Sequence, residues 1–226
     1  MTLTRRHLST AAALALGLAA LPASAQETIN MGAVLSLTGA NATVGEDVRR
    51  AVALAVEKVN ANGGVMGKKF NVIVEDSGGN ATTALNAARK LVSVDKVPVV
   101  IGEYSSGITL PMAQYLVKEG VAHINIASTS VKIRDLGASS FNLIGLEDKG
   151  NQFSSKDVWD LGYRNVAMIA PNNAYGQGVV HGFKQEFEKL GGKVIAEALY
   201  TAGQSTYRRE LQQLSRSNPD AYVYSA

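Results

Sequence analysis

The sequence of 226 residues contains no cysteine. Disulfide bonds, thiolate catalysis and thiolate metal ligands are therefore excluded. A chain of this length can bury enough apolar surface without cross-links, so the absence of cysteine is compatible with an oxidising compartment. Histidine is also scarce: His7, His123 and His181 are the only three. His123 lies within an apolar segment, which favours a hydrogen-bonded core histidine over a catalytic base.

A membrane-spanning segment is not indicated at the amino terminus. The apolar run Leu8–Leu21 is too short and too rich in alanine to favour a stable span. It follows Arg5-Arg6 and precedes Ala23-Ser24-Ala25, which is the pattern of a cleaved export signal over residues 1–25. The paired arginines also resemble a twin-arginine signal, so the Sec and twin-arginine routes both stay open. We expect a secreted, periplasmic protein; a retained anchor is the alternative.

Strong charge of either sign is absent as well. The formal net charge of +3 falls to +1 when the two arginines of the signal leave with it, because the signal holds no Asp or Glu. The pairs Lys68-Lys69 and Arg208-Arg209 are short and form no basic face. Nucleic acid is therefore not an expected partner.

Apolar strands and amphipathic helices alternate along the rest of the chain. Pro111 would be tolerated in the first turn of its helix, and Tyr207, Leu211 and Leu214 would face inward. The order is typical of the α/β class, with parallel sheets and helices on both faces. We predict strands over 28–35, 69–75, 97–101, 121–126, 141–144, 166–170, 193–200 and 221–224, and helices near 43–62, 84–92, 109–119, 151–161, 175–190 and 205–215.

The alternation pauses between Ser128 and Gly150, which indicates a crossing between two α/β lobes. We expect residues 26–146 to form an amino-terminal lobe without its carboxy-terminal return segments, and residues 147–226 to form a partial second lobe. No helix follows the last predicted strand, which would leave backbone and apolar groups exposed. A natural edge strand would explain this. Truncation is favoured, because about three strands are fewer than the usual five or six.

Small hydroxyl residues follow two neighbouring strands at the point where each strand ends. One strand leads into Gly102–Gly107 and the other into Ala127–Ser130. Ligands of open parallel sheets bind beyond the carboxyl ends of the strands. Hydroxyl groups and free N–H groups near a helix start suit a carboxylate. Helix capping by the serines would explain the pattern equally well.

Sequence patterns of common enzymes are missing. There is no Gly-x-Ser-x-Gly elbow. Gly176-Gln177-Gly178 lacks the third glycine of a dinucleotide-binding turn, and Gly67-Lys68 is not part of a phosphate loop. Glu46, Asp47 and Asp76 do not have the spacing of metal ligands. We therefore expect no catalytic residue, no metal and no cofactor. Binding without turnover explains the sequence best, and an enzyme is the least favoured class.

Short motifs in a fixed order cover essentially the whole mature chain. They are Met31–Gly39, Gly45, Ala61–Gly67, Asp76-Ser77, Val100–Gly102, Ser105-Ser106, Pro111, Ala127–Thr129 and Ala174–Gly176. With these motifs the sequence resembles type I periplasmic solute-binding proteins of the branched-chain amino-acid ABC transporter family, the leucine/isoleucine/valine-binding proteins. The resemblance implies two similar α/β lobes that close on a ligand in the cleft between them, with the second lobe incomplete in this chain.

The resemblance also implies a role for each residue of the two hydroxyl-rich loops. Ser106 would bind a ligand carboxylate through its hydroxyl and backbone, and Ser105 stands where several relatives have a disulfide cysteine. The carbonyl group of Ala127 would accept from a ligand ammonium group. Thr129 would bind both charged ends of the ligand, and Ser128 would contribute between them.

Further implied positions concern the second lobe and the ligand side chain. Tyr175 would close over the ligand from the second lobe. Ala42–Gly45 would border the side-chain pocket, where Val44 replaces an aromatic residue of some relatives. The family places another tyrosine and an acidic partner of the ammonium group beyond the position of Ala226.

The function that the resemblance implies is uptake of a branched-chain or related amino acid, delivered to ABC permease subunits in the membrane. Binding of an amide, urea or aromatic acid by the same fold is a second hypothesis, and a ligand-sensing receptor domain is a third. The ligand would contact both lobes only when they are closed, and would thereby favour the closed state.

Overall fold

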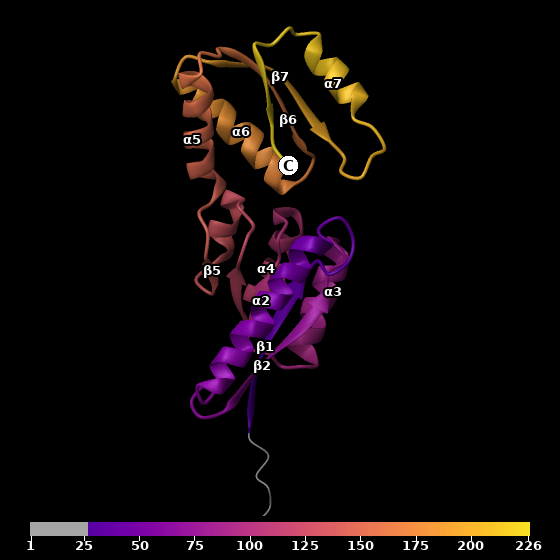
Figure 1. The fold of residues 1–226 in the computed structure, drawn as a ribbon, viewed down its shortest axis with the longest axis vertical. Coiled ribbons are helices and arrows are strands. Elements are labelled where there is room, and N and C mark those ends of the chain that lie inside the picture. The colour runs from indigo at the N-terminus through magenta and orange to yellow at the C-terminus, as the bar shows by residue number, and fades with distance from the viewer. Residues whose placement is uncertain (1–26) are drawn as a thin grey trace, which may run out of the picture.

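Two separate sheets organise the chain (Figure 1). The computed structural model describes residues 27–226, and the predicted export signal lies outside the described residues. We call the part built on the first sheet, with its helices, the first lobe, and the part built on the second sheet the second lobe. Within residues 27–226, no helix is both long enough and apolar enough to cross a membrane.

The first lobe is built on five parallel strands in the order β2-β1-β3-β4-β5. The strands are β1 (Thr28–Leu35), β2 (Lys69–Asp76), β3 (Val99–Gly102), β4 (Ala122–Asn125) and β5 (Ser140–Asn142). The helices are α2 (Ala42–Ala61), α3 (Ala81–Ser93) and α4 (Ser106–Lys118), together with a 3₁₀ helix at Val131–Leu136 that the sequence did not predict.

Alternation of side chains along the strands divides the first-lobe core into two layers. Val100 of β3 packs with α3 and α4, where Leu91 and Met112 are fully buried. The next residue, Ile101, packs on the opposite face of the sheet with Leu35 and the apolar stripe of α2. Packing from both sides fixes β3 in the sheet, and with it the start of the loop that follows the strand.

The second lobe is built on three parallel strands in the order β7-β6-β8. On one face, Phe183 and Phe187 fill the core, and the Trp159 ring meets Phe187 edge-on at a centroid distance of 6.4 Å. Tyr200 and Leu214 are buried on the other face. The strands are β6 (Asn165–Pro171), β7 (Lys193–Tyr200) and β8 (Ala221–Tyr224), and the helices are α5 (Glu147–Asp160), α6 (Ala174–Lys189) and α7 (Arg208–Ser215).

Several helix starts differ from the sequence prediction. Helix α4 begins at Ser106, so Pro111 lies in its second turn and not in the first. Helix α5 begins four residues earlier than predicted, and α7 three residues later. The inward orientation predicted for Leu211 is wrong, because this side chain is 48% exposed at the margin of the sheet beside the half-exposed Tyr222. Leu214 is fully buried, as predicted.

Helix α2 is fixed against the sheet at both ends. Gly45 permits a close approach at the amino end, since a Cβ atom at this position would lie 1.9 Å from the carbonyl oxygen of Ser36. Near the carboxyl end, the Asn60 side chain bonds both the N–H and the carbonyl group of Phe70, each at 2.8 Å. The amino end of α2 is thereby held beside the loops that follow the strands.

Candidate functional site

The two lobes face one another (Figure 1), and residues of both line a cavity of about 540 Å³. Each lining segment either ends a strand or follows one, so the carboxyl ends of both sheets meet at this cavity. None of the lining side chains carries a formal charge. The lining residues are Ala40, Asn41, Gly79, Tyr104, Ser105, Ser106, Gly107, Ile108, Ala127, Thr129, Pro171, Asn173, Tyr175, Tyr200, Ala202 and Ala226.

Five of the six ligand-binding residues predicted from the sequence line this cavity. Ser105 and Ser106 come from the start of α4, Ala127 and Thr129 from the loop after β4, and Tyr175 from the start of α6. Three segments that lie far apart in the sequence are thus brought together. Of the predicted set, only Ser128 does not line the cavity.

The start of α4 presents backbone donors and a hydroxyl group. Ser105 precedes the helix but makes no side-chain capping bond, so helix capping does not explain this serine. The N–H groups of Ser106 and Gly107 lie in the first turn, where N–H groups have no acceptor within the helix. The Ser106 hydroxyl oxygen accepts from the N–H of Ser130 at 3.2 Å, which leaves its O–H to donate. This arrangement suits an anionic group.

The loop after β4 is held by Asn125, which is fully buried. The Asn125 side chain accepts from the N–H of Ser128 at 2.9 Å and donates to its carbonyl oxygen at 2.7 Å. The Ser128 hydroxyl lies 2.5 Å from Thr109 Oγ1 and 3.0 Å from the carbonyl oxygens of Glu103 and Tyr104. Ser128 therefore connects this loop to the start of α4, and its buried geometry does not support the direct ligand contact that we expected.

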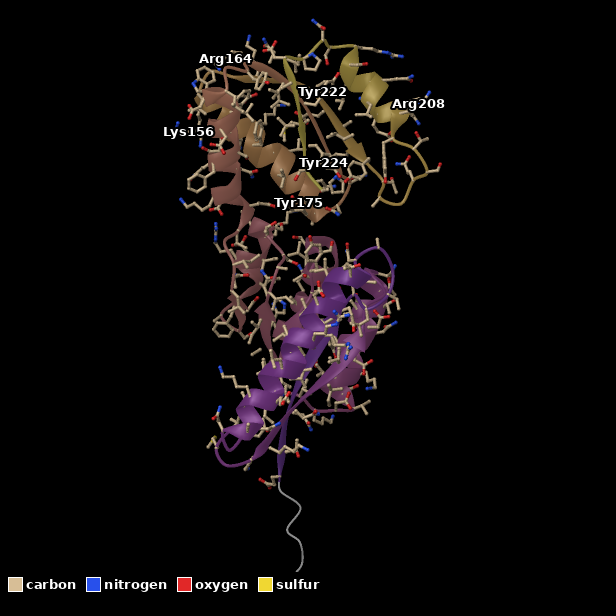
Figure 2. All side chains as sticks on the ribbon, viewed as in Figure 1. Lys156, Arg164, Tyr175, Arg208, Tyr222 and Tyr224 are labelled. Atoms are coloured by element: carbon tan, nitrogen blue, oxygen red, sulfur yellow. The ribbon has the colours of Figure 1, made fainter. Side chains whose placement is uncertain are left out.

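Tyr175 faces the cavity from the second lobe (Figure 2). Its hydroxyl is hydrogen-bonded to Ser225 Oγ at 2.6 Å, just beyond the end of β8. The helix start that carries it is capped by Asn173, whose side-chain oxygen accepts from the N–H of Gly176 at 3.0 Å. The ring is thus held at one end by the helix and at the other by the residue that follows β8.

Tyr104, Asn173 and Tyr200 are among the lining residues that were not predicted individually from the sequence. Tyr200 is the last residue of β7 and is only 8% exposed. Burial and the neighbouring Tyr224 hydroxyl together raise the pKa of its hydroxyl to about 12. Each of the three ends a strand or follows one, and Tyr104 lies within the loop Gly102–Gly107 that the strand-end rule indicated.

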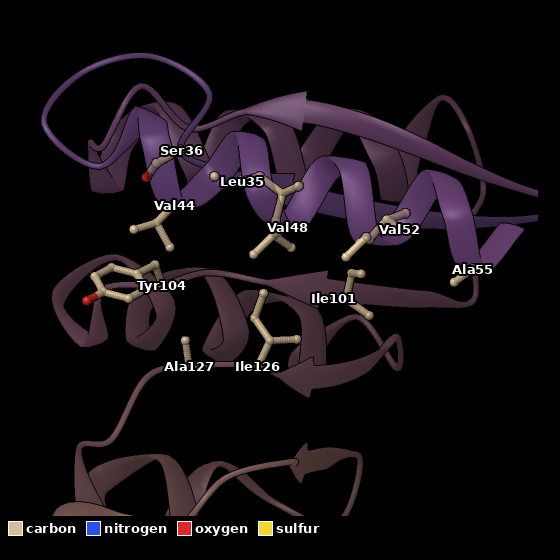
Figure 3. A pocket seen from close by; sticks show the side chains of 12 residues that line it. Leu35, Ser36, Val44, Val48, Val52, Ala55, Ile101, Tyr104, Ile126 and Ala127 are labelled. Atoms are coloured by element: carbon tan, nitrogen blue, oxygen red, sulfur yellow. The ribbon is translucent and has the colours of Figure 1, made fainter.

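A smaller apolar pocket of about 390 Å³ adjoins the cavity, and the two share Tyr104 and Ala127 as lining residues (Figure 3). Val48 and other apolar side chains of α2 form one wall, and Ile101 of β3 forms part of the other. Within the segment Ala42–Gly45, predicted to border a ligand side chain, Val44 and Gly45 line this pocket.

Comparison with known families decides the family of this chain. The family model described as periplasmic binding protein matches residues 28–226. The chain belongs to the periplasmic binding protein family. This match confirms the resemblance inferred from the ordered motifs, and the α/β fold with parallel sheets is confirmed as well.

Individual relatives agree with this assignment. An amino acid binding protein of Pseudomonas aeruginosa is 28% identical over 189 residues, which are 83% of this chain and 50% of that protein. A solved structure of a leucine binding protein from Thermotoga maritima has a TM-score of 0.81 at 22% identity, over 87% of this chain and 55% of the other. The solute binding protein of an ABC transporter from R. palustris, in complex with 4-hydroxybenzoate, has a TM-score of 0.80 at 17% identity. The match covers 88% of this chain and 54% of the other. The chain therefore spans about half the length of the relatives that it matches.

In this periplasmic binding protein, His123 has the structural role that the sequence favoured. The imidazole is fully buried in β4, with Nε2 2.7 Å from the carbonyl oxygen of Gly102 and Nδ1 3.0 Å from Ser140 Oγ. Because a carbonyl oxygen only accepts, Nε2 carries the proton and Nδ1 accepts from the hydroxyl. Burial lowers the pKa of this histidine. The neutral side chain thus links three neighbouring strands of the first sheet.

Glu147 is a buried acidic residue at the start of α5, close to the junction of the two lobes. Its Oε1 atom accepts from the N–H of Val131 at 3.2 Å, whereas Oε2 is buried without a hydrogen-bond partner among the described residues. Gly178 of α6 lies so close that a Cβ there would be 2.0 Å from Oε1. The pKa of Glu147 is raised to about 7, mainly because the carboxyl group is buried. The negative charge of Asp148 also raises this pKa, whereas the hydrogen bond from Val131 and the positive charge of Lys132 lower it.

Proposed function

We propose that this protein is the extracytoplasmic solute-binding component of an ABC importer and that it binds a small amino acid, branched-chain or related, between its lobes. The observation that carries the proposal is the convergence of the α4 start, the loop after β4 and Tyr175 on one cavity without charged side chains. Its volume of about 540 Å³ is within the usual range of small-molecule sites, about 300–1,000 Å³.

The residue roles follow from the chemistry of a zwitterion. The ligand carboxylate would accept from the Ser106 hydroxyl and from first-turn N–H groups of α4, where the helix dipole adds favourable charge. The carbonyl group of Ala127 and the hydroxyl of Thr129 would complete the polar shell around the ammonium group. Tyr175 would cover the ligand from the second lobe. A buried zwitterion needs each charge paired or hydrogen-bonded, which several neutral donors and acceptors can supply.

Transport would use the two-lobe arrangement. We infer that residues 1–25 direct export to the periplasm and that the lobes correspond to residues 26–146 and 147–226. A ligand that contacts both lobes only in the closed form shifts the population towards that form. Permease subunits in the membrane would then recognise the closed form and receive the ligand.

An aromatic carboxylic acid is the second candidate ligand. Three tyrosines, Tyr104, Tyr175 and Tyr200, line the cavity from both lobes. Aromatic rings favour offset-stacked or edge-on contacts with other rings. The structural neighbour in complex with 4-hydroxybenzoate supports this candidate. The same α4 start would bind the carboxylate of either ligand class.

Isothermal titration of the full-length protein with L-leucine, L-isoleucine and 4-hydroxybenzoate tests both candidates. We expect binding of at least one probe. Loss of a hydrogen bond to a charged group costs about 1.5–3 kcal/mol, so Ser106→Ala and Thr129→Ala should each weaken binding of that probe about 10- to 100-fold.

Ser93→Ala is the matched control, because Ser93 lies on α3 outside the cavity and its hydroxyl bonds only the carbonyl group of Arg89. The control should bind like the wild type. If Ser106→Ala and Thr129→Ala also kept wild-type affinity, the proposed site would be wrong.

A further inference from the structure

Glu103 is a fully buried acidic residue next to the proposed ligand site. It follows β3 directly and has no exposed surface. Among the ion pairs of residues 27–226, none includes Glu103. A buried carboxyl group without a cationic partner is costly unless hydrogen bonds satisfy its oxygens. Those bonds therefore show which parts of the fold depend on this side chain.

One carboxyl oxygen connects the ends of three adjacent strands. Glu103 Oε1 accepts from the Ser77 hydroxyl at 2.7 Å and also from the Ser36 hydroxyl. Ser36 follows β1 and Ser77 follows β2, whereas Glu103 follows β3. Because β2, β1 and β3 are neighbours in the sheet, a single oxygen gathers their carboxyl ends.

The rest of Glu103 contacts both loops of the proposed site. Its Oε2 atom accepts from the N–H of Ser105 at 3.0 Å. Its main-chain carbonyl oxygen accepts from the hydroxyl groups of Thr109 and Ser128, each at 3.0 Å. Glu103 thus holds the turn before α4 through its side chain and the loop after β4 through its backbone.

We propose that Glu103 is the positioning residue of the carboxylate subsite. Because Glu103 accepts from the N–H of Ser105, that donor is not available to a ligand. The N–H groups of Ser106 and Gly107 remain available to bind the ligand carboxylate. The inference rests on the proposed function, since the subsite matters only if a ligand carboxylate binds there. Glu103 itself does not line the cavity, so it acts through the loops that it holds.

Glu103→Gln tests the inference with little change in side-chain shape. An amide has one accepting oxygen, so either Ser105 loses its acceptor or the Ser36 and Ser77 hydroxyls lose theirs. With leucine as the probe, we expect affinity to fall about 10- to 100-fold. Leucinamide, which has no carboxylate, should lose much less affinity, so the preference for leucine should shrink. If leucine is not bound, 4-hydroxybenzoate and 4-hydroxybenzamide serve as the pair.

Asn60→Ala is the matched control for a general loss of stability. It removes two hydrogen bonds in the same lobe, between α2 and β2, at a place that does not line the cavity. This variant should keep the wild-type preference for the carboxylate probe. Ser77→Ala, a milder change that removes one donor to Glu103, should move the preference in the same direction as Glu103→Gln but less far.

Amide hydrogen exchange of the ligand-free protein provides a readout that needs no ligand. In Glu103→Leu, whose side chain is similar in size and offers no acceptor, the Ser105 N–H should exchange at least about tenfold faster, while Val34 and Val100 in the core strands exchange as in the wild type. Wild-type affinity for leucine, or an equal loss for leucine and leucinamide with uniformly faster exchange, would overturn the inference. If the wild type binds no probe but the Ser105 exchange rises selectively, the proposed function fails and the positioning of the loop stands.

Discussion

Replacement of Glu147 by glutamine should make the protein increasingly more stable than the wild type as the pH rises. In the wild type, the buried carboxyl group lies against α6 and close to Val131, with one oxygen lacking a partner. Burial raises its pKa from 4.5 to about 7. Glutamine has nearly the same shape and can accept from Val131, but it does not ionise in this range.

The sign and size of the effect follow from the two pKa values. Between pH 4.5 and pH 7 the unfolded chain has released this proton, whereas the folded chain still holds it. The unfolded state therefore binds fewer protons, and the free energy of unfolding falls as the pH rises. The difference between the two pKa values corresponds to a loss of about 3 kcal/mol for the wild type. Glu147→Gln does not incur this loss.

Urea unfolding at pH 4.5, 6, 7 and 8 measures the difference. Trp159, the only tryptophan in the sequence, lies on the same helix and reports its unfolding by fluorescence. We expect the two proteins to be about equally stable at pH 4.5 and the glutamine variant to be more stable by up to about 3 kcal/mol at pH 8. Glu188→Gln, an exposed change on α6, is the control and should follow the wild type. Parallel pH profiles for Glu147→Gln and the wild type would refute the reasoning.

Further predictions concern packing, and urea unfolding of each variant measures them. Gly45→Ala should cost about 1–3 kcal/mol, because its Cβ would lie 1.9 Å from a backbone oxygen that cannot move freely. Gly150→Ala should instead stabilise the protein by up to about 1 kcal/mol, since this position is an exposed helix interior with open space around it; a destabilised variant would contradict this. Phe187→Ala should cost about 3–5 kcal/mol because the ring is fully buried. Leu211→Ala, half-exposed, should change stability by less than about 1 kcal/mol, and a larger loss would mean that α7 packs differently.

The elements were predictable because their signals are local. Strand β7 and strand β8 have the predicted bounds, and β1 does as well. The helix starts were less accurate: α4 was placed near Thr109, although its first residue is Ser106. The apolar stripe of a helix fixes its middle well, whereas its first turn depends on which backbone groups the surrounding loops satisfy.

The candidate site was likewise predicted only in part from the sequence. The rule that parallel strands present ligands at their carboxyl ends led to the two hydroxyl-rich loops, and the family resemblance singled out Ser106 and Thr129 within them. The same rule did not distinguish Ser128, whose hydroxyl is bonded to Thr109 and to two carbonyl groups. Tyr200 was not predicted, although it ends β7 and lines the cavity.

The sequence by itself determined the alternation of strands and helices, the family and the two hydroxyl-rich loops, because periodicity and motif order are properties of neighbouring residues. Only the tertiary structure decided which hydroxyl groups reach the cavity, what Glu103 holds together and why Glu147 keeps its proton to about pH 7. Those properties depend on burial and hydrogen bonding between segments distant in the chain. Gly178, for example, is 31 residues from Glu147 in the sequence, yet its backbone lies against the carboxyl group and keeps water away from it.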